Sequence, residues 1–185
     1  MLKLVRLIQG DLRAKAQWSY DDNGWKNQLR ALASDGSAAM IVYRAMQASR
    51  RHHLPVLEML MNKVNSSLLG CIIGRCADFG PRFVLIHSNG VVINGKVRGG
   101  SDVFVEHQVT IGAERKQSPV IGNNVFIGAG AKVVGSVTVA DDVRIGANAV
   151  VTRDVPANTT VVGVPAKPIG IRHNVPDASS PNPRT

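Results

Sequence analysis

His87 and His107 are the side chains of this sequence best suited to acid–base chemistry, and 20 residues separate them. A neutral imidazole can accept the proton of a hydroxyl group at neutral pH, and such a base typically accelerates a reaction by about 10² to 10⁴. The two residues can serve one reaction only if the backbone brings them to the same face of the molecule. The other histidines lie in a basic segment and near the carboxyl terminus: His52, His53 and His173.

A six-residue repeat runs through the stretch VIGNNVFIGAGAKVVGSVTVADDVRIGANAVVTRDV, from Val120 to Val155. This period matches neither an amphipathic helix, which recurs near 3.6 residues, nor a two-faced strand, which alternates every second residue. It is typical of a solenoid in which stacked repeats create a shared core, with three hexads in one coil of about 18 residues. The aliphatic positions are Ile121, Ile127, Val133, Val139, Ile145 and Val151.

The same period begins earlier in the chain, where a shift of two residues separates two successive coils. A coil lengthened by this shift spans the 20 residues between the histidines, and each histidine follows an aliphatic core residue by two positions. We therefore expect both imidazoles to point outward from one face of neighbouring coils. The core positions of these coils are Ile73, Phe79, Leu85 and Val91, followed by Ile93, Gly99, Val105 and Ile111.

These patterns divide the chain into three parts. Residues 1–70 contain good helix formers, with one helix predicted in SAAMIVYRAMQAS after a cap at Ser37 and another in LPVLEMLMNKVNSSLL, whose first turn carries Pro55. We expect WSYDDNGWKNQ to be a loop and SRRHH to be a solvated connector. We expect residues 71–170 to form the solenoid, with the polar stretch at 113–120 ejected as a loop. Residues 171–185 are the C-terminal tail, in which PDASSPNPRT has the composition of a disordered segment.

The repeat region resembles the hexapeptide-repeat acyltransferases. This resemblance implies a mainly β fold, a left-handed parallel β-helix that assembles into homotrimers, here with an N-terminal α-helical segment. It also implies acetyl-CoA as co-substrate, and direct transfer of the acetyl group in a ternary complex.

The motifs LIHSNGVVINGKV and VFVEHQVTIG resemble the serine O-acetyltransferase branch, and within it the enzymes that acetylate capsular or colanic-acid-type polysaccharides. The resemblance places the catalytic base at His87. Three side chains of the serine enzymes are missing, because Ile86 and Ile72 stand in place of aspartates and Ser118 in place of a histidine. An amino acid's ammonium needs a carboxylate, so we expect the acceptor to be a sugar hydroxyl of a polysaccharide or its precursor.

The motifs that bind the acetyl donor in this branch are better preserved than the residues that bind the acceptor. The segments IGAGAK, IGANAV and TIGA match those that bind the pantetheine arm and the thioester, where backbone N–H groups can hold an oxyanion. Tight bends also require small residues, so these motifs have a structural explanation as well. The resemblance implies coenzyme A contacts at Gly112, Ala113, Ala129, Ala147 and Lys167. We expect His87 and His107 in the catalytic site, and Glu106 and Ser118 in contact with the acceptor.

Composition limits the partners. The formal charge of the chain is +9, and residues 1–70 hold ten Lys or Arg against five Asp or Glu, which favours an anionic partner such as a membrane surface contacted peripherally. Aromatic residues make up only 4% and no nucleic-acid-binding motif is present, so we expect no nucleic acid. No apolar run approaches the roughly 20 residues of a membrane span, and we expect a cytoplasmic protein.

Two other classes of function remain as alternatives to sugar acetylation, besides serine acetylation itself. A γ-type carbonic anhydrase shares the β-helix but needs three zinc histidines, and the repeats contain two, so we expect no metal. Cys71 and Cys76 lack a second ligand cluster and are expected to be free thiols. A non-catalytic solenoid that binds a partner is the second class.

Overall fold

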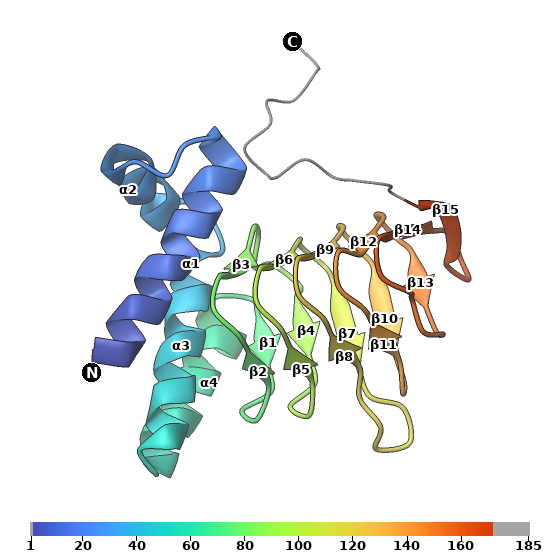
Figure 1. Ribbon diagram of the computed structural model, residues 1–185. Coiled ribbons are helices and arrows are strands. Elements are labelled where there is room, and N and C mark those ends of the chain that lie inside the picture. The colour runs from blue at the N-terminus through green and yellow to red at the C-terminus, as the bar shows by residue number, and fades with distance from the viewer. Residues whose placement is uncertain (1, 172–185) are drawn as a thin grey trace.

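The computed structural model describes residues 2–171, in which four helices precede a stack of short strands. The helices lie at the end of the stack where the first strands are found (Figure 1). Residues 172–185, which include His173 and nearly all of the predicted tail, lie outside the described range.

The helical region contains four helices: α1 (Leu2–Tyr20), α2 (Trp25–Ala33), α3 (Ser37–Arg51) and α4 (Pro55–Leu68). The last two match the helices that the sequence predicts, and Pro55 occupies the first turn of α4.

Three local predictions in the helical region are wrong. Only residues 21–24 separate α1 from α2, because the remainder of WSYDDNGWKNQ continues these helices. α3 extends through Arg51, so most of the predicted connector is helical. Ser37 is not the cap of α3: Gly36 precedes the helix with φ +80°, and the Ser37 hydroxyl donates to the carbonyl of Ala31 at 2.5 Å.

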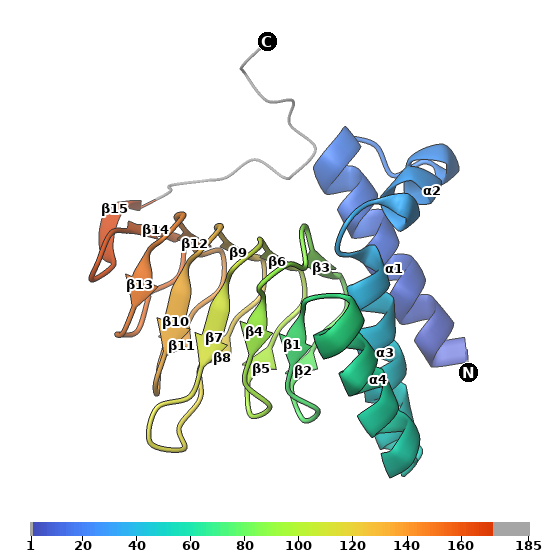
Figure 2. The same cartoon turned by 180° about the vertical axis from the view of Figure 1, so that it is seen from behind.

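The strands form a parallel solenoid with three faces, and neighbouring strands of each face come from successive coils. One sheet has the order β1-β4-β7-β10-β13, another β2-β5-β8-β11, and the last β3-β6-β9-β12-β14, to which β15 adds antiparallel (Figures 1 and 2). The strands are β1 (Ile72–Ile73), β2 (Asp78–Phe79), β3 (Phe83–Leu85), β4 (Val92–Ile93), β5 (Arg98–Gly99), β6 (Val103–Val105), β7 (Thr110–Gly112), β8 (Val120–Ile121), β9 (Val125–Ile127), β10 (Lys132–Val134), β11 (Thr138–Val139), β12 (Arg144–Ile145), β13 (Val150–Val151), β14 (Thr159–Val162) and β15 (Lys167–Ile171).

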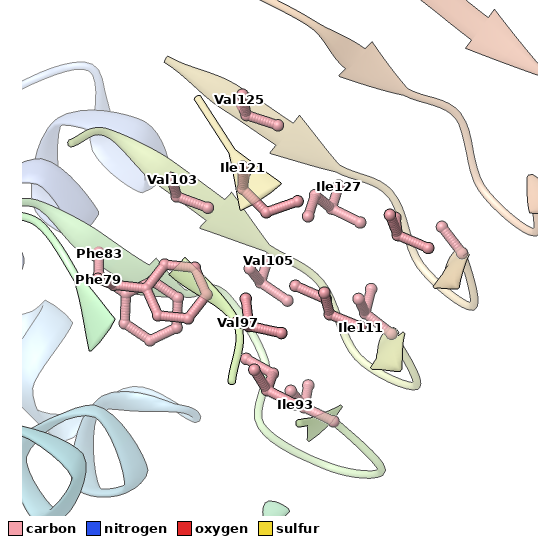
Figure 3. Packing of buried hydrophobic residues seen from close by; sticks show 14 of the residues in the cluster. Phe79, Phe83, Ile93, Val97, Val103, Val105, Ile111, Ile121, Val125 and Ile127 are labelled. Carbon is pink, nitrogen blue, oxygen red and sulfur yellow. The ribbon is translucent and has the colours of Figure 1, made fainter. Parts of the chain in front are cut away.

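The register follows the predicted shift between the first two coils. Ile73 pairs with Ile93, Phe79 with Gly99 and Leu85 with Val105, each across 20 residues. The buried side chains of successive coils form columns along the axis (Figure 3).

Gly99 interrupts one of these aliphatic columns for a steric reason. A Cβ at this position would lie 2.1 Å from the ring of Phe79, which stacks on Phe83 with ring centroids 4.3 Å apart. The two aromatic rings of the first coil therefore fill the space that a side chain at Gly99 would take.

A buried ion pair ties the helices to the first coil. Arg44 of α3 and Asp11 of α1 have fully buried side chains, and Arg44 Nε donates to Asp11 Oδ2 at 2.6 Å. The guanidinium also donates to the carbonyls of Phe79 at 2.9 Å and Gly80 at 2.6 Å, while Asp11 Oδ1 accepts from the Phe83 amide at 3.1 Å. The terminal coil of a solenoid exposes core and unpaired backbone groups, and this network closes that end.

Within residues 2–171, no helix is long and apolar enough to cross a membrane. Contact with an anionic membrane surface stays a prediction.

The buried pair of Arg44 and Asp11 and the exposed pair of Arg82 and Asp102 should differ in their contribution to stability. Replacing Arg44 by Met leaves the Asp11 charge buried and unpaired, and should lower the free energy of unfolding by about 3–5 kcal/mol. Arg82→Met is the matched control, because the side chains of Arg82 and Asp102 are 48% and 31% exposed, and should cost less than about 1 kcal/mol. Urea denaturation at one protein concentration measures both, and equal losses would contradict this ranking.

Candidate active site

The two repeat histidines lie side by side, as their spacing predicts. His87 follows β3 by two residues and His107 follows β6 by two, and the register pairs Leu85 with Val105. Their ring centroids are 5.8 Å apart at an interplanar angle of 77°. Both imidazoles are about half exposed, with 51% and 45% of their side-chain surface open to solvent. They occupy the corner where the sheet of β3 and β6 turns into the sheet of β4 and β7.

A carboxylate from the helical region contacts the first histidine. Asp35, in the loop between α2 and α3, places its Oδ2 3.0 Å from His87 Nδ1. An ionised carboxylate only accepts hydrogen bonds, so Nδ1 carries the proton. The lone pair of His87 is then on Nε2, where it can accept a proton from a substrate.

Asp35 is held in the ionised, oriented form. Its other oxygen, Oδ1, accepts from the Gly36 amide at 2.8 Å and from the Ser88 hydroxyl at 3.4 Å. Partial burial alone would raise the pKa of Asp35, but the hydrogen bonds from His87 and Gly36 and the charge of His87 together hold it below its ordinary value. The carboxylate is therefore charged at neutral pH.

The second histidine has a looser carboxylate neighbour. His107 Nδ1 lies 3.4 Å from Oε2 of the adjacent Glu106, whose side chain is 20% exposed. This contact is longer than the 3.0 Å between His87 and Asp35. His87 is thus the imidazole whose orientation and tautomer are better fixed.

The corner that holds the histidines continues along the solenoid with small residues. Two positions after the paired strands β9 and β12 come Ala129 and Ala147, in register with His107. The imidazoles of the first two coils are therefore followed by a shelf with little side-chain bulk. An extended ligand chain can lie close to the backbone there.

The remaining predicted residues are elsewhere in the chain. Gly112 ends β7 and Ala113 follows it, at the next corner of the coil. The hairpin that begins there carries Ser118, whose hydroxyl donates to Asn94 Oδ1 at 3.1 Å. Lys167 begins β15 at the far end of the solenoid. A single chain therefore does not bring these residues to the histidines.

Asp35 is the residue that sequence reasoning missed. It lies 52 positions before His87, outside the repeats, and no motif marks it. Only the packing of the helices on the first coil brings it to the corner.

Within residues 2–171, no three His, Cys, Asp or Glu side chains lie close enough together to hold a metal ion. Cys71 is buried and Cys76 exposed, and both are free. Burial raises the pKa of the Cys71 thiol to about 12, so this thiol is a poor nucleophile.

Comparisons with known proteins agree with this architecture. The family model described as bacterial transferase hexapeptide (six repeats) matches residues 118–153. Serine acetyltransferase of Helicobacter pylori strain J99 is 35% identical over 170 residues, which cover 90% of this chain and 94% of the relative.

Solved structures extend the similarity to three dimensions. Serine acetyltransferase of Neisseria gonorrhoeae superposes with a TM-score of 0.84 at 29% identity, covering 100% of this chain and 73% of the other. The Brucella abortus enzyme in complex with coenzyme A gives 0.81 at 27% identity, covering 92% and 69%. The fold is thus the left-handed parallel β-helix that the resemblance implies, and the chain is an acetyl-CoA-dependent acyltransferase.

The predicted polysaccharide acceptor is wrong. The relatives and structural neighbours are serine acetyltransferases. The prediction rested on the missing carboxylates at Ile72 and Ile86, but Asp35 supplies a carboxylate to the same corner from the helical region.

The contact between Asp35 and His87 should be visible in titration. Because the hydrogen bond and the charge of His87 lower the pKa of Asp35, His87→Ala should raise that pKa. Carboxyl ¹³C NMR of the folded protein measures it, with His53→Ala as control, since His53 lies in the turn after α3. An unchanged Asp35 pKa in the His87→Ala protein would show that the two groups do not interact.

Proposed function

Because the chain belongs to the serine acetyltransferase family of hexapeptide-repeat acyltransferases, we propose that it transfers the acetyl group of acetyl-CoA to the hydroxyl of serine. The observation that carries this proposal is the 3.0 Å contact between His87 Nδ1 and Asp35 Oδ2. It gives the corner both a fixed base and a negative charge.

His87 acts as the general base. Its Nε2 accepts the proton of the serine hydroxyl as the oxygen attacks the thioester carbon, and the charge of Asp35 stabilises the imidazolium that forms. When the tetrahedral intermediate collapses, the carbon–sulfur bond breaks and the sulfur of coenzyme A takes the proton from His87. His107, 5.8 Å away between ring centroids, is the second imidazole of the site and contacts the acceptor.

The same corner can bind the ammonium of serine. Asp35 is ionised and about half exposed, and Glu106 contributes a second carboxylate beside His107. An ammonium between carboxylates at a partly desolvated corner gains more than it would in water. A sugar hydroxyl carries no positive charge to pair with these carboxylates.

The acetyl group passes directly from coenzyme A to the acceptor. Cys71 is buried, and Cys76 lies between β1 and β2, at a different corner of the coil from His87. Neither thiol is placed to form an acyl-enzyme with the base. The shelf at Ala129 and Ala147 supports the pantetheine arm, which leads toward Lys167 for the nucleotide phosphates.

We further propose that the enzyme is a homotrimer whose sites lie between subunits. The donor-binding positions Gly112 and Ala113 occupy a different corner from the histidines of the same chain. A neighbouring copy that presents its own Gly112 corner would complete the site.

Sedimentation velocity tests this assembly, with turnover of acetyl-CoA measured on the same fractions. A trimer that carries the activity is expected. A fully active monomer would overturn the proposed assembly without affecting the role of His87.

The acceptor is tested by comparing serine with 3-hydroxypropionate, which has the same hydroxyl and carboxylate but no ammonium. Thiol release from acetyl-CoA should be rapid with serine and much slower with 3-hydroxypropionate, because no ammonium then pairs with the negative charge of Asp35 and Glu106. His87→Ala is the control and should lower turnover with serine by roughly 10² to 10⁴ while binding of coenzyme A is retained. Equal rates with both acceptors, or full activity without His87, would refute the proposal.

A further inference from the structure

Lys15 joins the two chain segments that carry Asp35 and His87. It lies on α1 and is only 1% exposed. Its ammonium donates one hydrogen bond to the backbone carbonyl of Asp35 and another, at 2.9 Å, to the carbonyl of Leu85. Leu85 ends β3 and precedes His87 by two residues. One side chain therefore bridges the loop that supplies the carboxylate and the strand that supplies the imidazole.

The ammonium of Lys15 is costly to bury. The two carbonyls that accept its hydrogen bonds are neutral, and burial lowers the pKa of Lys15 to about 8, although the charge of Asp35 opposes this effect. Placing an ammonium in a buried site without a directly bonded carboxylate disfavours its charged form. Methionine would fill a similar volume without this cost. What lysine provides at this position, and an apolar side chain does not, is the pair of hydrogen bonds to the carbonyls of Asp35 and Leu85.

The helix that carries Lys15 is itself firmly attached. One turn earlier, Asp11 pairs with Arg44 in the buried network. Almost one turn later, Trp18 packs on Phe104 of β6, with ring centroids 4.9 Å apart. Lys15 thus extends from a part of α1 that is held on both sides.

The loop on the other side of the bridge is packed tightly against the same strand end. Gly36 has φ +80°, and a Cβ there would lie 2.4 Å from the carbonyl oxygen of Leu85. The Gly36 amide fixes Asp35 Oδ1 at 2.8 Å, which leaves Oδ2 for His87. A small displacement of this loop would therefore move the carboxylate away from the imidazole.

We infer that Lys15 is a positioning residue, which holds the Asp35 loop against the end of β3 so that the Asp35 carboxylate fixes the tautomer of His87. The effect of Lys15 on kcat rests on the proposed function, in which His87 is the base. The effect of Lys15 on the tautomer of the His87 ring is independent of the proposed function.

The structural consequence is measured by ¹⁵N NMR of the histidine rings, at a pH at which imidazole is neutral. In the wild-type protein the Asp35 carboxylate keeps the proton of His87 on Nδ1. Lys15→Met should let His87 exchange between its two tautomers, as Asp35→Asn should. Lys3→Met, which removes an exposed lysine from the same helix, should leave the Nδ1–H tautomer unchanged. A wild-type tautomer in folded Lys15→Met protein would overturn the inference.

The kinetic consequence is measured as a double-mutant cycle with serine as acceptor. Lys15→Met should lower kcat by roughly 10- to 100-fold with little change in KM for acetyl-CoA, because a displacement of about 1 Å in the catalytic groups has an effect of this size. If Lys15 acts through Asp35, the same substitution in the Asp35→Asn background should lower kcat by less than about twofold further. Losses that multiply in full would show that Lys15 acts independently of Asp35.

Lys15→Gln keeps the inference testable if Lys15→Met does not fold. The glutamine amide reaches less far than the ammonium, so it should keep one of the two carbonyl contacts and give a mixed His87 tautomer. Wild-type values in this variant would also overturn the inference. If the wild type fails to acetylate serine but the tautomer changes as described, the proposed function fails and the positioning role of Lys15 stands.

Discussion

The buried pair of Arg44 and Asp11 is the interaction on which the geometry of the site depends. Taking two charges out of water is expensive, and their attraction offsets this cost only when the remaining hydrogen-bonding positions are also satisfied. Here the guanidinium reaches two backbone carbonyls of the first coil and the carboxylate receives a backbone amide from the same coil. The pair therefore fixes α1 and α3 on the solenoid, and with them the loop that places Asp35 3.0 Å from His87.

The solenoid contributes the other half of the site through its register. Stacking one coil on the next repeats the same corner along the axis, so His87 and His107 become neighbours and Ala129 and Ala147 follow in line. The first two coils carry imidazoles at this position and the next two carry only methyl groups, which in the proposed function leaves room for the pantetheine arm of the donor. In the proposed function, one repeated backbone position thus holds the base in the first coil and supports the donor in later coils, and only the side chain differs.

Features that depend on neighbouring repeats can be predicted from the sequence, whereas contacts between distant parts of the chain cannot. The period of six and the shift of two are enough to pair Leu85 with Val105, and hence the two histidines. The contact of Asp35 with His87 cannot be predicted in this way, because it depends on how the helices pack on the first coil, and this carboxylate is what the prediction of a sugar acceptor lacks. The predicted cap at Ser37 is wrong for a local reason, because the residue that precedes α3 is Gly36, which adopts a left-handed conformation next to the carbonyl of Leu85.

The central claim is that Asp35 and His87 act as one unit, although they come from different parts of the chain. A double-mutant cycle on turnover, with Asp35→Ala, His87→Ala and the combined variant, tests it most directly. The account predicts that Asp35→Ala lowers kcat, measured at saturating serine, by roughly 10²-fold in the wild-type background and has almost no effect on kcat once His87 is absent. If the two losses multiply in the combined variant, Asp35 acts independently of His87 and the account is contradicted.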